Sequence, residues 1–130
     1  MVDPRLVDGW IEKADEDLLF AKASLKDGLE FYPQICFLLH QAVEKYLKAY
    51  IVAKELDFEK IHDLGRLVKI CAQKNADFDH YFEEVIDLNA YYIETRYPDF
   101  EVKADKLQTE KALKAAEEVA KLVRSKLSLD

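Results

Sequence analysis

The stretch that decides the fold is QICFLLHQAVEKYLKAYIVA, residues 34–53. Apolar side chains surround nearly the whole circumference when these residues are placed on a helix of about 3.6 residues per turn. Pro33 comes directly before the stretch, and the fixed φ of proline suits a first helical turn. A helix that is apolar on nearly every side is buried by its neighbours. We therefore expect residues 34–53 to form the central helix of a bundle.

One narrow edge of this helix is polar. The side chains that share it are Gln41, Glu44, Lys45 and Lys48, with His40 just beside them. Glu44 precedes Lys48 by four residues, which is the favourable order for an ion pair on one helix. The edge is therefore either a solvated seam with a structural ion pair or a binding site, and both interpretations stay open at this stage.

Start and stop signals on both sides of the central stretch predict its neighbours. Asp3 and Pro4 indicate the start of a first helix that ends near Gly28. Three more helices are expected, at about residues 60–74 with His62 at the very start, from a cap at Asp77 or Asp79 to about residue 97, and at about residues 109–126. The prediction is an all-α fold, an up-and-down bundle of four long helices plus a short helix, in a single domain over residues 1–130.

Length, charge and cysteine content exclude several classes of protein. The chain has 130 residues and a formal net charge of −7, which disfavours non-specific binding to DNA or to anionic membranes. A local basic patch can still bind one nucleotide. No stretch reaches the roughly 18 uninterrupted apolar residues of a membrane span, and the N-terminus lacks the pattern of a signal peptide. With only two cysteines and no disulfide framework, we expect a soluble cytoplasmic protein.

A possible metal site combines Cys36 with His40, which are four residues apart on the central helix. No further pair of Cys and His completes a tetrahedral set, so we interpret the two as a buried thiol beside a partly buried imidazole. We expect no bound metal and no cofactor.

A third group of functional side chains lies in the run ETRYPD, residues 94–99. Pro98 disfavours helical geometry just before it, so Arg96 and Tyr97 are expected at the end of a helix. A guanidinium group beside an aromatic ring suits a phosphate and a base, through forked hydrogen bonds and stacking. The alternative is a helix cap with a packed tyrosine, and the two interpretations have similar weight.

Three motifs in order resemble those of the HEPN domain, a small helical module of higher eukaryotes and prokaryotes: CFLLHQAVEKYLKAY, then IHDLGRL, then YYIETRYPD. The resemblance covers nearly the whole chain. It implies a bundle of four to five helices, commonly a homodimer, often encoded beside a minimal nucleotidyltransferase and sometimes part of a toxin–antitoxin pair.

Some HEPN proteins are metal-independent ribonucleases whose signature is an Arg followed four to six residues later by a His. No Arg of this chain has a His at that spacing. The chain instead is similar to the branch with Tyr-Pro after the Arg, which implies a nucleotide- or partner-binding role for Lys45, Lys48, His62, Arg96 and Tyr97. We predict no catalytic residue.

Three functional hypotheses follow. The first is a non-catalytic binding module that helps a minimal nucleotidyltransferase to hold its nucleotide or acceptor substrate. The second is a ribonuclease toxin that uses His62 with Arg96 in an unusual arrangement. The third is a dimeric assembly protein whose polar edge is only structural.

Overall fold

The computed structural model describes residues 2–94 and 103–129, and these residues contain helices and connections but no strand. The elements are α1 (Pro4–Lys26), α2 (Tyr32–Ala53), α3 (Leu64–Lys74), the 3₁₀ helix η1 (Ala76–Tyr81), α4 (Phe82–Ile86), α5 (Asn89–Glu94) and α6 (Lys106–Lys126). The predicted all-α fold class is confirmed. Within the described ranges, none of the helices is both long and apolar enough to span a membrane.

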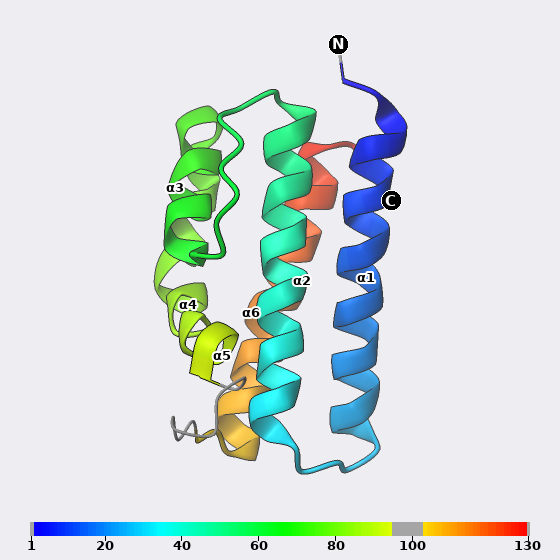
Figure 1. Cartoon of the computed structure of the whole chain (residues 1–130), viewed down its shortest axis with the longest axis vertical. Coiled ribbons are helices and arrows are strands. Elements are labelled where there is room, and N and C mark those ends of the chain that lie inside the picture. The colour runs from blue at the N-terminus through cyan, green and yellow to red at the C-terminus, as the bar shows by residue number, and fades with distance from the viewer. Residues whose placement is uncertain (1, 95–102, 130) are drawn as a thin grey trace.

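The central helix of the bundle is α2, as the sequence predicts. Figure 1 shows α1 and α2 side by side and antiparallel, with α6 behind α2 and α3 on its other side. Contacts join α2 to α1, α3, α5 and α6. The largest side chains buried around it include Tyr46, Tyr50 and Phe78, so one core links α2 to the later, shorter elements.

Side-chain caps set where the helices begin. Asp3 accepts a hydrogen bond from the Arg5 backbone N–H at the start of α1, as expected from the Asp-Pro signal. Asp63 caps α3, which begins at Leu64 and not near residue 60, so His62 lies in the preceding connection and not in the helix. Asp105 forms a reciprocal capping box with Gln108, which places the start of α6 a few residues before Thr109.

The predicted fourth long helix is broken into η1, α4 and α5. Its first turn is capped by Asn75, whose side chain accepts from the Asp77 backbone N–H, and not by Asp77 or Asp79. A second break follows α4, just before Asn89. The Asn89 amide bonds to Leu64 and Asp63 on α3, and a side chain used in this way competes with regular helix.

The connection between α2 and α3, residues 54–63, runs back along α2. Figure 1 shows this segment passing between the two helices before α3 begins. It carries Phe58 and His62, which both contact side chains near α2. The fold therefore brings His62 to the polar edge of α2.

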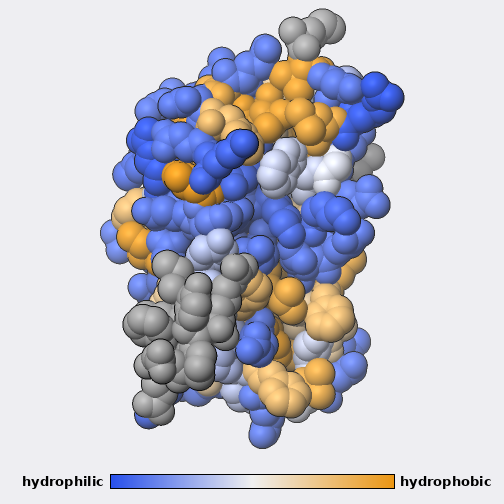
Figure 2. All heavy atoms as spheres, viewed as in Figure 1, coloured by the Kyte–Doolittle hydropathy of each residue, from blue (hydrophilic) through white to orange (hydrophobic). Residues whose placement is uncertain are grey.

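Apolar side chains remain exposed at one end of the bundle, around the connection between α1 and α2. They are Leu19, Phe20, Leu29 and Phe31. Figure 2 shows apolar groups gathered near the lower end and near the upper end of the viewed face, with a hydrophilic band between them.

Candidate functional site

The polar edge of α2 is buried and holds an ion pair. The Lys48 ammonium nitrogen lies 3.0 Å from Glu44 Oε2, and each residue is only 5 % exposed. The predicted pair between Glu44 and Lys48 is therefore present, inside the protein and not on a solvated seam. Lys48 also lies 5.9 Å from the ring centre of Trp10 and 5.7 Å from that of Phe58, within reach of cation–π attraction. These contacts enclose the lysine.

His62 occupies the other oxygen of the same carboxylate. Its Nδ1 lies 2.9 Å from Glu44 Oε1, and the histidine side chain is 46 % exposed. Because an ionised carboxylate only accepts hydrogen bonds, Nδ1 carries the hydrogen, and Nε2 is the ring nitrogen that remains for a ligand. Nε2 accepts a hydrogen bond when the ring is neutral and donates one when the ring is protonated.

His40 supports this arrangement from inside the core. It is fully buried, and its Nε2 donates to the backbone carbonyl of His62 over 2.9 Å. That bond fixes the tautomer, since a carbonyl only accepts. Burial lowers the pKa of His40, so the buried ring is neutral at neutral pH, although the nearby Glu44 carboxylate opposes the shift. His40 therefore positions the backbone of His62.

Tyr92 of α5 completes the group. Its ring is stacked on His62 with centroids 4.1 Å apart and an interplanar angle of 22°. Tyr92 is also stacked on His40, whose ring centroid lies 5.3 Å from that of Tyr92. We call His40, Glu44, Lys48, His62 and Tyr92 together the His62 site.

The structure brings together only some of the predicted site residues. Lys48 and His62 share the Glu44 carboxylate, but Lys45 pairs with Asp17 of α1, with Nζ 2.6 Å from Oδ2. Both lysines thus have carboxylate partners within the chain, and they do not form an open cationic groove. Arg96 and Tyr97 lie outside the described residues.

Sequence reasoning missed the roles of His40 and Tyr92. His40 had a local signal, because it precedes Glu44 by four residues and so lies on the same side of α2. Tyr92 had none, since its contact with His62 depends on how α5 packs against α2.

Cys36 and His40 have separate partners. The Cys36 sulfur lies 3.5 Å from the Thr109 hydroxyl oxygen, and burial raises the pKa of the thiol. His40 uses Nε2 on a backbone carbonyl. In the described portion of the chain, no group of three or more His, Cys, Asp or Glu side chains is arranged to hold a metal ion.

Comparison with known proteins agrees with this helical arrangement. The family model of the HEPN domain matches residues 7–126. The chain belongs to the HEPN domain family. The crystal structure of an archaeal HEPN homologue is similar in fold, with a TM-score of 0.71 and 22 % sequence identity, over 92 % of this chain and 96 % of the homologue. No curated protein matches the chain.

Membership of the HEPN family gives the His62 site a context. The His62 site combines residues from the central helix, the following connection and α5, which are the regions of the three HEPN-like motifs in the sequence. Its single carboxylate is already shared by one ammonium group and one imidazole. The group of this site that is open to a ligand is the His62 imidazole, whose side chain is 46 % exposed.

Proposed function

We propose that this HEPN protein is a homodimeric, non-catalytic binding module that helps a minimal nucleotidyltransferase to hold its nucleotide or acceptor substrate. The observation that carries the proposal is the His62 site: a half-exposed imidazole is oriented by Glu44 and stacked on Tyr92. A protonated imidazole binds phosphate oxygens, and aromatic rings stack on bases.

The sequence next to the His62 site adds support to the proposal. Arg96 comes four residues after Tyr92, and Tyr97 comes five residues after it. A guanidinium group and a second aromatic ring are therefore close to the site along the chain. Arginine is the side chain best suited to forked hydrogen bonds with phosphate. The two internally paired lysines contribute less under this proposal than they did in the sequence-based prediction, because a ligand must compete with Glu44 or Asp17 for them.

The test is calorimetric titration of ATP into the protein alone and into its complex with a nucleotidyltransferase encoded beside it. We expect binding that requires both chains and weakens at least about tenfold in His62→Ala and in Arg96→Ala, the range for losing a charged hydrogen bond. His80→Ala is the matched control, because His80 is exposed on η1, away from the His62 site. A protein that binds neither ATP nor the enzyme contradicts the proposal.

A second candidate function rests on the pairing of Glu44 with His62. A carboxylate that holds Nδ1 of a neutral histidine leaves Nε2 as a proton acceptor, which is the arrangement of a general base. The corresponding activity is metal-independent cleavage of RNA, with His62 taking the proton of the 2′-hydroxyl group.

RNA cleavage measured in the presence of EDTA decides between the two candidates. Cleavage that is lost in His62→Ala, in Arg96→Ala and in Glu44→Gln, but kept in His80→Ala, supports the ribonuclease. The absence of cleavage by the intact protein, together with ATP binding to the two-chain complex, supports the binding module.

A further inference from the structure

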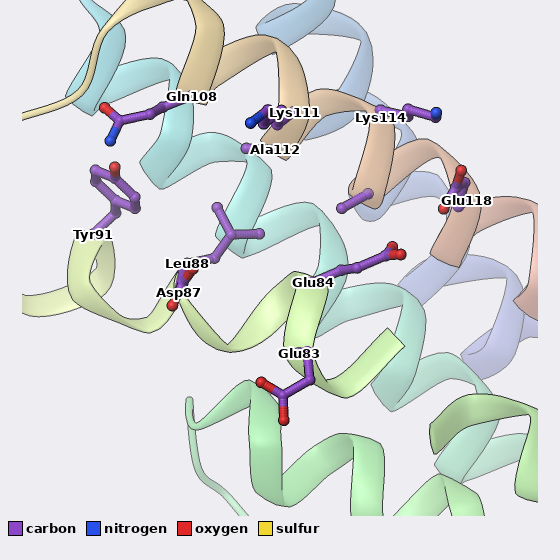
Figure 3. A pocket seen from close by; sticks show the side chains of 11 residues that line it. Glu83, Glu84, Asp87, Leu88, Tyr91, Gln108, Lys111, Ala112, Lys114 and Glu118 are labelled. Carbon is purple, nitrogen blue, oxygen red and sulfur yellow. The ribbon is translucent and has the colours of Figure 1, made fainter. Parts of the chain in front are cut away.

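A groove lies between α6 and the pair α4 and α5, and it shares no lining residue with the His62 site. It has a volume of about 420 Å³. Figure 3 shows Leu88 and Ala112 between the two sides of the groove, with charged side chains around them. Leu88 is 3 % exposed and Ala115 is 5 % exposed, so the floor consists of small or well-packed apolar groups. Such a floor admits a side chain from outside.

The two walls of the groove differ in charge. Glu83, Glu84 and Asp87 line the side of α4 and the turn that follows it, whereas the α6 side carries the cations Lys111 and Lys114 and, one turn later, the acid Glu118. Among the described residues, no ion pair joins one wall to the other, although such pairs are common elsewhere on this surface. Among the described residues, the charged groups of the two walls are therefore not joined by an ion pair across the groove, although Lys114 partly offsets the charge at Glu84.

Glu84 of the acidic wall lies near a second carboxylate, Glu118 of α6. Partial burial raises the pKa of the Glu84 carboxyl, and the neighbouring Glu118 carboxyl raises it further, while Lys114 only partly compensates. A positive group placed against Glu84 from outside would therefore be attracted.

An apolar side chain projects beside the groove. Leu107 of α6 is 61 % exposed. It precedes Lys111 by four residues and Lys114 by seven, so all three lie on one face of the helix. This face of α6 thus presents an apolar group followed by two cations, which complements an apolar floor beside an acidic wall.

We propose that two copies of the chain associate through this groove, with the α6 face of each copy against the acidic wall of the other. A two-fold axis makes each such contact twice, so Lys111 and Lys114 meet Glu83, Glu84 and Asp87 on both sides of the interface. Leu107 of each copy covers the apolar floor of the other. The inference rests on the homodimer in the proposed function, but not on its nucleotide or on the enzyme partner.

The exposed apolar end near the connection between α1 and α2 does not select an occupant in this way. Its residues carry no pattern of charge that would distinguish a second copy from any other apolar surface. The groove does select a second copy as its occupant, because its two walls complement each other after a two-fold rotation.

The test is a pair of charge-reversed variants of the full chain. One carries Lys111→Glu and Lys114→Glu, and the other carries Glu83→Lys and Glu84→Lys. All four positions are exposed, so each variant should fold, which circular dichroism and thermal melting can check. Sedimentation should show that the dissociation constant of the dimer rises on the order of a hundredfold in each variant, because like charges then face each other at both contacts.

Mixing the two variants gives the decisive result. In a one-to-one mixture, the acidic wall of each contact again faces a basic one, so a heterodimer should form with close to the original affinity. A control with Lys13→Glu and Lys26→Glu on α1 makes the same change of charge away from the groove and should leave the dimer intact.

Three results would overturn the proposed interface. A monomeric wild-type protein removes both the homodimer and its surface, and titration of ATP then still tests the nucleotide separately. Dimers that persist in both variants place the interface elsewhere and leave the proposed function untouched. A mixture that stays monomeric shows that the two walls do not face each other.

Discussion

The Glu44 carboxylate binds His62 through one oxygen and Lys48 through the other, at 2.9 Å and 3.0 Å. His62 is eighteen residues away in sequence, in the connection that runs back along α2, while Lys48 is on the next turn of the same helix. One buried acid thus fixes both a cation of the core and a half-exposed side chain of the candidate site. The stability of the bundle and the geometry of the site are therefore coupled.

The first prediction concerns the loss of that charge. Glu44→Gln keeps the size of the side chain but leaves the Lys48 ammonium group buried without an anion. We expect the free energy of unfolding to fall by about 3 kcal/mol, the usual cost of breaking a buried ion pair from one side. Unfolding by urea, monitored by circular dichroism, measures the change.

The double variant Glu44→Gln, Lys48→Met is the control for this prediction. Methionine keeps an unbranched stem between Trp10 and Phe58 without a charge to compensate. The double variant should be more stable than Glu44→Gln alone, because no buried cation remains unpaired. If the losses in the free energy of unfolding from the two substitutions simply add, Glu44 does not compensate the charge of Lys48.

The second prediction concerns acid sensitivity. The pKa of His40 is lowered from 6.5 by burial, so between the lowered value and 6.5 the unfolded chain binds a proton at this position that the folded chain does not. Stability should therefore fall as the pH drops below about 6.5, with a slope of up to about 1.4 kcal/mol per pH unit from this group. The Glu44 carboxylate and the His62 ring also face the His40 ring.

His40→Gln isolates the contribution of His40. The glutamine amide can still donate to the His62 carbonyl but does not titrate, so the difference in slope from the wild type between pH 7 and pH 5 belongs to His40. His80→Gln, at an exposed position on η1, makes the same substitution on the surface and serves as the comparison. An equal slope in wild type and His40→Gln contradicts a buried neutral histidine.

The sequence predicted the fold well where local signals decide it. The apolar stretch over residues 34–53 identified α2, and the Asp-Pro pair identified the start of α1. The breaks in the fourth helix were not predictable, because Asn89 uses its amide on α3, a contact that no local pattern contains. The helix expected from about residue 60 begins only at Leu64, after the Asp63 cap. The start of α6 at Lys106 was misplaced by a few residues because Asp105 was not recognised as its cap.

Local patterns predicted only the α2 component of the candidate site, and His62 was included through the resemblance to the HEPN motifs. Glu44 and Lys48 have the spacing of an ion pair on one helix, and that pair is confirmed. Their burial, and the pairing of Lys45 with Asp17 in place of a ligand, follow from the packing of α1 on α2. The approach of His62 and Tyr92 depends on two separate segments folding back onto α2, which periodicity does not encode.

The third prediction compares two glycines in helices. A Cβ atom on Gly65 would lie 3.0 Å from Phe82 Cε2 and 3.3 Å from Asp63 Oδ1, whereas one on Gly9 would meet nothing within 4 Å. Gly65→Ala should therefore lower stability by about 1 kcal/mol or more, since crowding exceeds the gain in helix propensity. Gly9→Ala should raise stability by up to about 1 kcal/mol. Thermal melting of both variants measures the contrast. Melting temperatures that shift in the same direction would contradict it.

The fourth prediction concerns the amide that joins α5 to α3. Asn89 Oδ1 accepts from the Leu64 backbone N–H over 2.9 Å, and Asn89 Nδ2 donates to Asp63 Oδ1 over 3.0 Å. Asn89→Ala leaves Leu64 N–H without this acceptor, so stability should fall by about 1–2 kcal/mol. The stack of Tyr92 on His62 should loosen as well, because Tyr92 is on the same short helix as Asn89.

Proton NMR of the His62 ring measures that loosening directly. The ring of Tyr92, 4.1 Å away, shifts the His62 carbon-bound protons upfield in the wild type, and Tyr92→Leu should abolish the shift. Asn89→Ala should reduce this upfield shift part of the way. Asp105→Ala removes a cap on α6, so it should lower stability by about 1 kcal/mol and leave the upfield shift unchanged. An unchanged His62 signal in Asn89→Ala would mean that packing of α5 on α2 alone holds Tyr92 in place, and that the amide contributes only to the start of α3.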